Sequence, residues 1–312
     1  MPPIAKVAAE GHVPVTREVE SEASPYGAAI GKSPAGLIVR FAENKLGLVG
    51  VALFVGVVLF AFVGPLLYHT DQIHTNFDQV DLPPGAAGHL LGTDQSGYDV
   101  LGRLMAGGQT SLIVSVAAAF LAAVGGSLVG AAAGFSASVV DSVLMRLVDA
   151  FMSIPQLFVV IVVATIVVPS RASLMIIIAS MSWFTTARLV RGEALRIREL
   201  EYVEAARSVG SGRPRIVIRH VLPNAVGVIV VSTTFQVADA ILILASLDFL
   251  GLGIPSPSAS WGGMLSTGLQ YIYDGYWWLI FPAGGIIMVA VMAVNFIGDG
   301  LRDAVETRLR ER

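Results

Sequence analysis

The sequence predicts an all-α polytopic membrane protein with six transmembrane helices, and three observations lead to this fold class. Only 14% of the 312 residues are charged and 54% are hydrophobic, whereas soluble domains carry about 25% charged residues. Six apolar stretches approach or reach the length that crosses a hydrocarbon layer about 30 Å thick. Their apolar character is continuous rather than alternating, which favours helices over the strands of a membrane barrel. The predicted spans are residues 46–67, 111–135, 150–170, 172–188, 224–250 and 278–298.

Each of the first four spans has its own character. Span 46–67 contains no charged residue, and span 111–135 is crowded with alanine and glycine. Because small residues let helix backbones approach closely in lipid, we expect the second span to be a buried packing helix. Pro155 predicts a kink in the third span. The fourth span, 172–188, is short and is expected to end at the membrane interface.

The distribution of positive charge predicts the topology. With six spans, 18 of the 20 Lys and Arg residues fall on one side, and only Arg103 and Arg171 fall on the other. Cytoplasmic loops carry the excess of Lys and Arg, so both termini and the 189–223 loop are predicted to be cytoplasmic. Residues 1–35 are rich in Ala, Pro, Ser and Glu and are interpreted as a mobile cytoplasmic tail. Residues 36–312 would form the membrane domain.

No catalytic, cofactor or metal site is predicted in this chain. Gly31-Lys32-Ser33 superficially matches a phosphate-binding loop, but the glycine that the motif requires five positions earlier is Tyr26. The chain contains no cysteine, which excludes disulfides and thiolate metal sites. The histidines are not spaced as metal ligands. Nor do we expect a nucleic-acid partner.

The external segment after the first span has two possible roles. Asp99 and Arg103 are spaced i, i+4 and could pair on a short interfacial helix, capped by Thr93 or Asp94. That helix could be purely structural, or it could contact an external partner. The second external loop, 251–276, is rich in aromatic residues that suit an interfacial belt. The candidates for partner contact are Asp94, Asp99, Arg103 and Trp261.

Span five carries an ionisable residue well inside the apolar stretch. Asp239 lies there with Thr233 and Gln236, each three residues apart on one helix face. Ionisable residues within spans usually face the bundle interior or a water-filled path. These three residues are therefore pathway candidates, and a structural pair between Asp239 and a partner chain is the alternative. Asp248 lies nearer the outer end and is easier to solvate.

The 189–223 loop combines a small-residue helix with a glycine turn. The alanine pair gives the helix a thin face that can enter a groove on another protein, and Gly210 can end it in a left-handed conformation. Gly212 and Pro214 are expected to turn the chain into a second short helix, which Pro223 would end before span five. The residues that carry the pattern are Glu204, Ala205, Ala206, Gly210, Leu222 and Pro223.

This pattern resembles the EAA loop through which ABC importer permeases couple to their ATPases. Three further segments, HLLGTDQSGYDVLGRL, DFLGLGIPSPSASWGGML and NFIGDGLRDAVETRLR, are similar to those of the dipeptide/oligopeptide/nickel branch, specifically its C-type permease subunit. The resemblance covers nearly the whole chain from about residue 36. It implies a type I ABC importer permease fold, with residues 36–312 as the transmembrane permease domain and 189–223 as the EAA coupling loop.

The resemblance also implies a function and a set of partners. The chain would form half of the translocation pathway of an ATP-driven importer, most readily for di- or oligopeptides, and would not itself be an enzyme. The implied partners are a homologous second permease, ABC ATPase subunits that bind ATP and Mg, an extracytoplasmic substrate-binding protein, and the lipid of a bacterial-type inner membrane. The alternatives are a nickel-chelate importer of the same family, an ion-gradient-driven secondary transporter, and a purely structural membrane subunit.

Two positions depart from the family pattern. His220 stands where importers in general favour isoleucine, although the peptide branch often has the RHxLPN sequence found here. Leu244 and Asp248 stand where the branch usually has a glutamate and then a serine. If that glutamate shapes the pathway in relatives, Asp239 or Asp248 would have to replace it.

Overall fold

The protein is a bundle of long helices, here described from a computed structural model that covers residues 35–136 and 138–310. Those residues form helices and turns, with one isolated β-bridge and no strand. Five of the described helices are long and apolar enough to span a membrane, and there are six if a sharply bent helix pair counts as one span. The all-α fold class with six spans is therefore confirmed. The predicted tail, 1–35, lies outside the described residues except for Ala35, where α1 begins.

The first span is interrupted at both ends. Helix α1 (Ala35–Glu43) is separated from α2 (Lys45–Phe62) by Asn44, whose side chain accepts a hydrogen bond from the Gly47 amide at 2.8 Å. Asn44 also donates to Asp303 near the other end of the chain at 2.9 Å. Beyond Phe62 the chain forms only the single turn of α3 (Gly64–Leu67). The predicted continuous span over 46–67 is thus two helices.

Helix α4 (Val100–Phe135) is the packing helix that its small residues predicted. It forms the most extensive contact in the bundle, with α7 (Arg171–Arg198). A Cβ atom on Gly126 would come 2.5 Å from the Trp183 carbonyl oxygen, so only glycine permits this approach. At 36 residues the helix starts well before the predicted position 111, because the external residues 100–110 continue the same helix.

The third span is the main departure from expectation. A single helix over 150–170 does not form; instead α5 (Ser138–Met152) meets α6 (Gln156–Ile166) at an angle of 85°. Pro155 occupies the N-cap of α6 and has no N–H with which to continue the preceding helix. The kink expected at Pro155 is therefore a complete break, and the span starts more than ten residues earlier than predicted.

Helix α7 is also longer than predicted. Ser170 and Ser173 form a reciprocal capping box at its start, and the helix continues ten residues beyond the predicted end at 188. Within this extension the Arg191 guanidinium pairs with Asp141 of α5 at 2.5 and 2.6 Å. Arg188 pairs with Asp149 of the same helix. These ion pairs join the part of α7 that was expected to be a loop to α5.

The loop after α7 returns directly into the next long helix. Helix α8 (Glu201–Ser208) is followed by α9 (Arg213–Ile216), a π turn at Val217–Val221 and α10 (Leu222–Phe249). Pro223 was expected to end the second short helix, and this is wrong. It lies in the first turn of α10, directly after the π turn, in a helix that continues from Arg213 to Phe249. The helix therefore passes through Pro223 instead of ending there.

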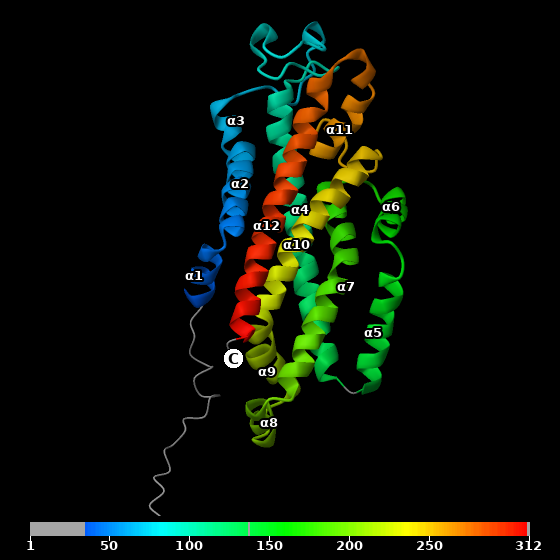
Figure 1. Cartoon of the computed structure of the whole chain (residues 1–312). Helices are drawn as coiled ribbons and strands as arrows, with labels where there is room; N and C mark the ends of the chain where they lie inside the picture. The colour runs from blue at the N-terminus through cyan, green and yellow to red at the C-terminus, as the bar shows by residue number, and fades with distance from the viewer. Residues whose placement is uncertain (1–34, 137, 311–312) are drawn as a thin grey trace, which may run out of the picture.

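The loop between α10 and α12 folds back into the bundle. It contains α11 (Trp261–Leu269) and leads to α12 (Phe281–Arg310), which continues 12 residues beyond the predicted end at 298. Trp261 is fully buried, and its indole Nε1 donates to the Leu104 carbonyl at 2.9 Å. The interfacial-belt interpretation is therefore wrong for Trp261, which is a core residue that fastens the loop onto α4. Figure 1 shows α11 beside the upper parts of α4, α10 and α12.

Candidate functional site

Helix α8 is the candidate coupling element, and one buried side chain holds it on the bundle. Val203 is fully buried in a cluster that includes Ile197 of α7 and Ile216 of α9. Glu204 and Ala205, the next two residues, are exposed. The helix therefore turns the first two residues of the predicted motif away from the bundle. Figure 1 shows α8 projecting beyond the ends of α7 and α9.

The glycine turn takes the predicted conformation. Gly210 has φ +86°, in the left-handed region, and its amide donates to the Arg207 carbonyl at 2.9 Å. The Ser211 amide donates to the Ala206 carbonyl at 3.0 Å, so the last turn of α8 is closed by backbone bonds. A Cβ atom on Gly210 would meet nothing within 4 Å. The backbone angle, not crowding, requires glycine here.

An exposed apolar stripe on α8 was missed by the sequence analysis. Tyr202, Ala205 and Val209 are spaced i, i+3 and i+7, which places them on one helix face. All three are exposed, Val209 to 84% of its surface and Tyr202 to 40%. Exposed apolar side chains next to a small residue are typical of a surface that another protein covers. Their spacing in EYVEAARSV was the signal that could have found them.

The other three residues of the predicted motif do not lie on the exposed face of α8. Ala206 is half-buried. Leu222 packs against the cluster under α8, while Pro223 is exposed on the first turn of α10. The structure thus brings Leu222 close to α8 as support and does not place it on the exposed face.

The three pathway candidates do not share one environment. Gln236 is buried, and its amide nitrogen donates to Thr186 of α7 and to Ser232. Thr233 is half-buried and donates to the Ile229 carbonyl at 2.7 Å. Asp239 is exposed and forms no hydrogen bond or ion pair within the described ranges of the chain. Gln236 therefore joins α10 to α7. Asp239 is the one of the three residues whose side chain lies on the surface of this chain.

Leu244 and Asp248, the two residues that depart from the family pattern near the end of span five, have different environments. Leu244 is fully buried in the core shared by α4, α7 and α10. Asp248 is buried as well, and its Oδ1 accepts a hydrogen bond from the Ile254 amide at 2.8 Å. Asp248 thus fixes the turn that follows α10. Asp239 is therefore the carboxylate of α10 that is available to take the place of the family's glutamate.

Comparison with known proteins identifies the family. The family described as "Binding-protein-dependent transport system inner membrane component" matches residues 126–311, more than half of the chain. Residues 35–84 match the family described as the N-terminal TM domain of oligopeptide transport permease C. The chain belongs to the binding-protein-dependent transport permeases. It is therefore a permease subunit of an ABC importer, a multi-pass membrane protein and not an enzyme.

Two curated relatives match the permease over most of its length. The oligopeptide transport system permease protein OppC of Bacillus subtilis is 37% identical over 274 residues, which cover 88% of this chain and 89% of the relative. The dipeptide transport system permease protein DppC of the same organism is 36% identical over 271 residues, which cover 87% and 84%. Both alignments extend over far more of the permease than the α8 region alone.

The external segment of the permease has different contacts from those predicted. The N-cap of α4 is Asp99, which accepts from the Gly102 amide at 2.7 Å, rather than Thr93 or Asp94. Because its carboxylate also accepts from the Tyr68 hydroxyl, it is not available to Arg103. The predicted Asp99–Arg103 pair is therefore wrong.

Arg103 of the permease instead joins the segment before α4 to the loop between α10 and α12. Its guanidinium approaches Asp94 at 3.8 Å, lies over the Tyr98 ring at 4.2 Å and donates to the Pro257 carbonyl at 2.7 Å. Burial raises the pKa of the Asp94 carboxyl, against the opposing effects of two backbone amides and Arg103. Asp94, Asp99, Arg103 and Trp261 all make internal contacts, which favours the structural interpretation of this segment.

Replacing Asp99 by alanine tests this interpretation. We expect the melting temperature of the permease complex to fall, because the change removes an N-cap worth about 1–2 kcal/mol and leaves the buried Gly102 amide without its acceptor. Limited proteolysis between residues 69 and 98 should become faster. Asp71→Ala is the matched control, since the Asp71 side chain is 58% exposed and serves only a local turn. Equal melting and proteolysis of the two variants would contradict the capping role.

Proposed function

We propose that this permease imports di- or oligopeptides, driven by ATP that partner subunits bind with Mg and hydrolyse. The observation that carries this proposal is the similarity, over nearly nine-tenths of the chain, to permeases whose names specify oligopeptide and dipeptide transport. A homologous second permease would complete the pathway. An extracytoplasmic binding protein would deliver the peptide.

We propose that α8 is the coupling element that the ATPase grips. Its exposed surface carries Glu204, Ala205 and Val209, and the small Ala205 leaves room for a groove of another protein to approach closely. Beneath that face, Val203 packs in one cluster with residues of α7, α9 and α10. Because close-packed side chains transmit displacement rather than absorb it, a shift of α8 would move the inner ends of α7 and α10 together. That movement would alternate access to the pathway.

The proposed orientation puts both termini and α8 in the cytoplasm. In Figure 1, α1, the C-terminal end of α12, α8 and α9 lie at one end of the bundle, as an even number of spans requires. The charge distribution of the sequence assigns 18 of the 20 Lys and Arg residues to the side predicted to be cytoplasmic. The acidic external segment and α11 lie at the opposite end.

Asp239 is the proposed pathway residue. A carboxylate on a membrane-spanning helix requires water or a partner, and the described residues of this chain offer Asp239 neither a hydrogen bond nor an ion pair. We propose that it faces either the central cavity or the second permease. Thr233, half-buried on the same helix, would lie nearer the inner end of the same path.

Reconstituted transport tests the function. The complex, in proteoliposomes with its binding protein, should accumulate a labelled di- or tetrapeptide when ATP and Mg are supplied to the cytoplasmic face. A non-hydrolysable ATP analogue should abolish accumulation. Uptake driven by a proton or sodium gradient without ATP would contradict the proposal and favour a secondary transporter. Accumulation of nickel chelates without peptide uptake would keep the permease assignment but overturn the substrate class.

A further inference from the structure

A basic cavity lies beside the coupling helix, at the ends of α4 and α7. Its volume is about 570 Å³, within the range of small-ligand sites. The lining comes from the end of α4 and from the stretch 198–216, which holds the end of α7, part of α8 and the turn into α9. The lining residues are Phe135, Ser136, Arg198, Glu199, Arg207, Ser211, Gly212, Arg213 and Ile216.

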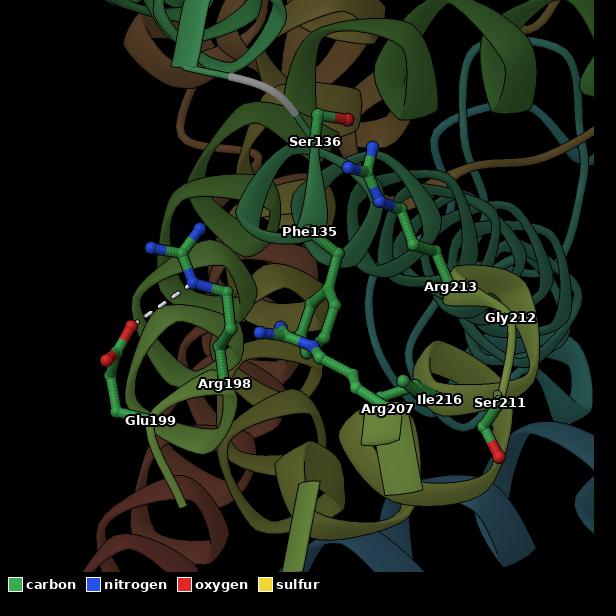
Figure 2. A pocket seen from close by; sticks show the side chains of 9 residues that line it. All are labelled: Phe135, Ser136, Arg198, Glu199, Arg207, Ser211, Gly212, Arg213 and Ile216. Carbon is green, nitrogen blue, oxygen red and sulfur yellow. Dashed lines mark hydrogen bonds and ion pairs between the residues drawn. The ribbon is translucent and has the colours of Figure 1, made fainter. Parts of the chain in front are cut away.

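Two of the three arginines that line this cavity remain available to bind a ligand. Arg198 donates to the Gly134 carbonyl and approaches Glu199 at 3.2 Å, so it is fixed in place. Arg207 lies over the Phe135 ring at 5.4 Å and Arg213 is exposed. Neither Arg207 nor Arg213 forms a hydrogen bond or ion pair with the described residues 35–136 and 138–310. In Figure 2 the Arg213 guanidinium is directed toward Ser136, and that of Arg207 lies against Phe135.

We propose that this cavity binds a phosphate group. Three guanidinium groups against one carboxylate leave a net positive charge, and arginine forks bind phosphate oxygens with two parallel hydrogen bonds. A tetrahedral phosphate presents acceptor oxygens in several directions, which suits donors that converge from different helices better than a planar carboxylate does.

Two sources of phosphate fit this chemistry: the headgroup of an anionic lipid and a soluble phosphate. The apolar surface next to the cavity favours the lipid. Helix α5 begins two residues after Ser136 and exposes Val139 to 74% and Val143 to 54% of their surfaces, and Ile218 of the π turn is 67% exposed. Basic pockets between helices on the cytoplasmic side are suited to anionic headgroups. The inference rests on the proposed function only for the orientation that makes this side cytoplasmic.

Native mass spectrometry of the intact complex, purified in neutral detergent, tests the proposal. Wild-type complex should retain phosphatidylglycerol in preference to phosphatidylcholine. The double variant Arg207→Gln with Arg213→Gln should bind it about tenfold more weakly, because two charge-assisted contacts are lost. Both side chains lack internal hydrogen bonds, so folding should be retained. Arg215→Gln is the matched control, since Arg215 is exposed in the same loop but does not line the cavity.

A second arm distinguishes the two sources. Inorganic phosphate at millimolar concentration is added to complex stripped of anionic lipid, and its binding is followed by phosphorus NMR. Binding that is lost in the double variant, without selective phosphatidylglycerol retention, would assign the site to soluble phosphate. If neither probe responds to the double variant, or if Arg215→Gln weakens binding equally, the site does not exist. Loss of ATPase co-purification alone, with unchanged binding of both probes, would also overturn the proposal by identifying a protein contact. Because neither arm uses ATP or transport, the outcome is independent of the test of import.

Discussion

Replacing Gly130 by valine is expected to prevent α4 from packing against α7 and to abolish recovery of the assembled permease. A Cβ atom at this position would overlap the Ala187 carbonyl oxygen and come 3.0 Å from Ala187 Cα. These are backbone atoms, so the two helices themselves would have to separate. Overpacking of this kind costs about 3 kcal/mol or more when the backbone cannot yield. The measurement is the yield and melting temperature of the detergent-solubilised complex.

The same helix supplies the control for this prediction. A Cβ atom on Gly125 would meet nothing within 4 Å, so Gly125→Val adds the same β-branched side chain to α4 without a clash. It should be recovered and melt close to wild type. Similar yields and melting temperatures for both valine variants would show that the α4–α7 contact does not depend on the absence of a side chain at position 130.

Two substitutions on α8 are expected to uncouple ATP hydrolysis from peptide uptake. Gly210→Val forces a β-branched residue into the left-handed region, at a cost of about 1–2 kcal/mol, and should reorient the end of α8. Glu204→Lys reverses an exposed charge in the first turn of the same helix. For each, we expect uptake in proteoliposomes to fall at least tenfold while the complex still inserts and ATP hydrolysis persists.

Each of these variants has a matched control. Gly212 has φ −65°, which any residue adopts, so Gly212→Ala should leave uptake unchanged. Glu201 occupies the same helical turn as Glu204, so Glu201→Lys weakens the favourable charge at the helix start equally. A loss of uptake that is equal for Glu201→Lys and Glu204→Lys would attribute the effect to helix stability rather than docking. Normal uptake with Gly210→Val would exclude α8 as the coupling element.

Much of this architecture could be predicted because it depends on local sequence. The apolar runs predicted helices, since no other open structure satisfies its backbone within lipid. The small residues of α4 predicted close packing, and the glycine-specific backbone angle at Gly210 was predictable from a single residue between a helix and a turn. The α8 motif was located for the same reason, because the signals for its helix, its glycine turn and its proline each lie within a few neighbouring residues.

The errors arose where distant residues compete for one partner. Asp99 and Arg103 have the right spacing for an ion pair, but Tyr68 and the Gly102 amide occupy the Asp99 carboxylate. Arg191 and Asp141 are 50 residues apart, and their pairing extends α7 beyond the length that its apolar composition predicts. Gln236 remains a pathway candidate, but its hydrogen bond to Thr186, 50 residues away, has no local signal in the sequence.

The sequence by itself determined the membrane-spanning helical class, the uneven distribution of positive charge between the loops, and the helix-and-glycine motif of α8, because these depend on composition and on backbone preferences of single residues. Only the tertiary structure decided that the third span is broken by 85°, that Trp261 is a core residue, and that Arg198, Arg207 and Arg213 converge on one cavity. The physical reason is that side-chain partners are chosen by packing in space. Trp261 and the Leu104 carbonyl, hydrogen-bonded across 157 residues, have no local signal that connects them.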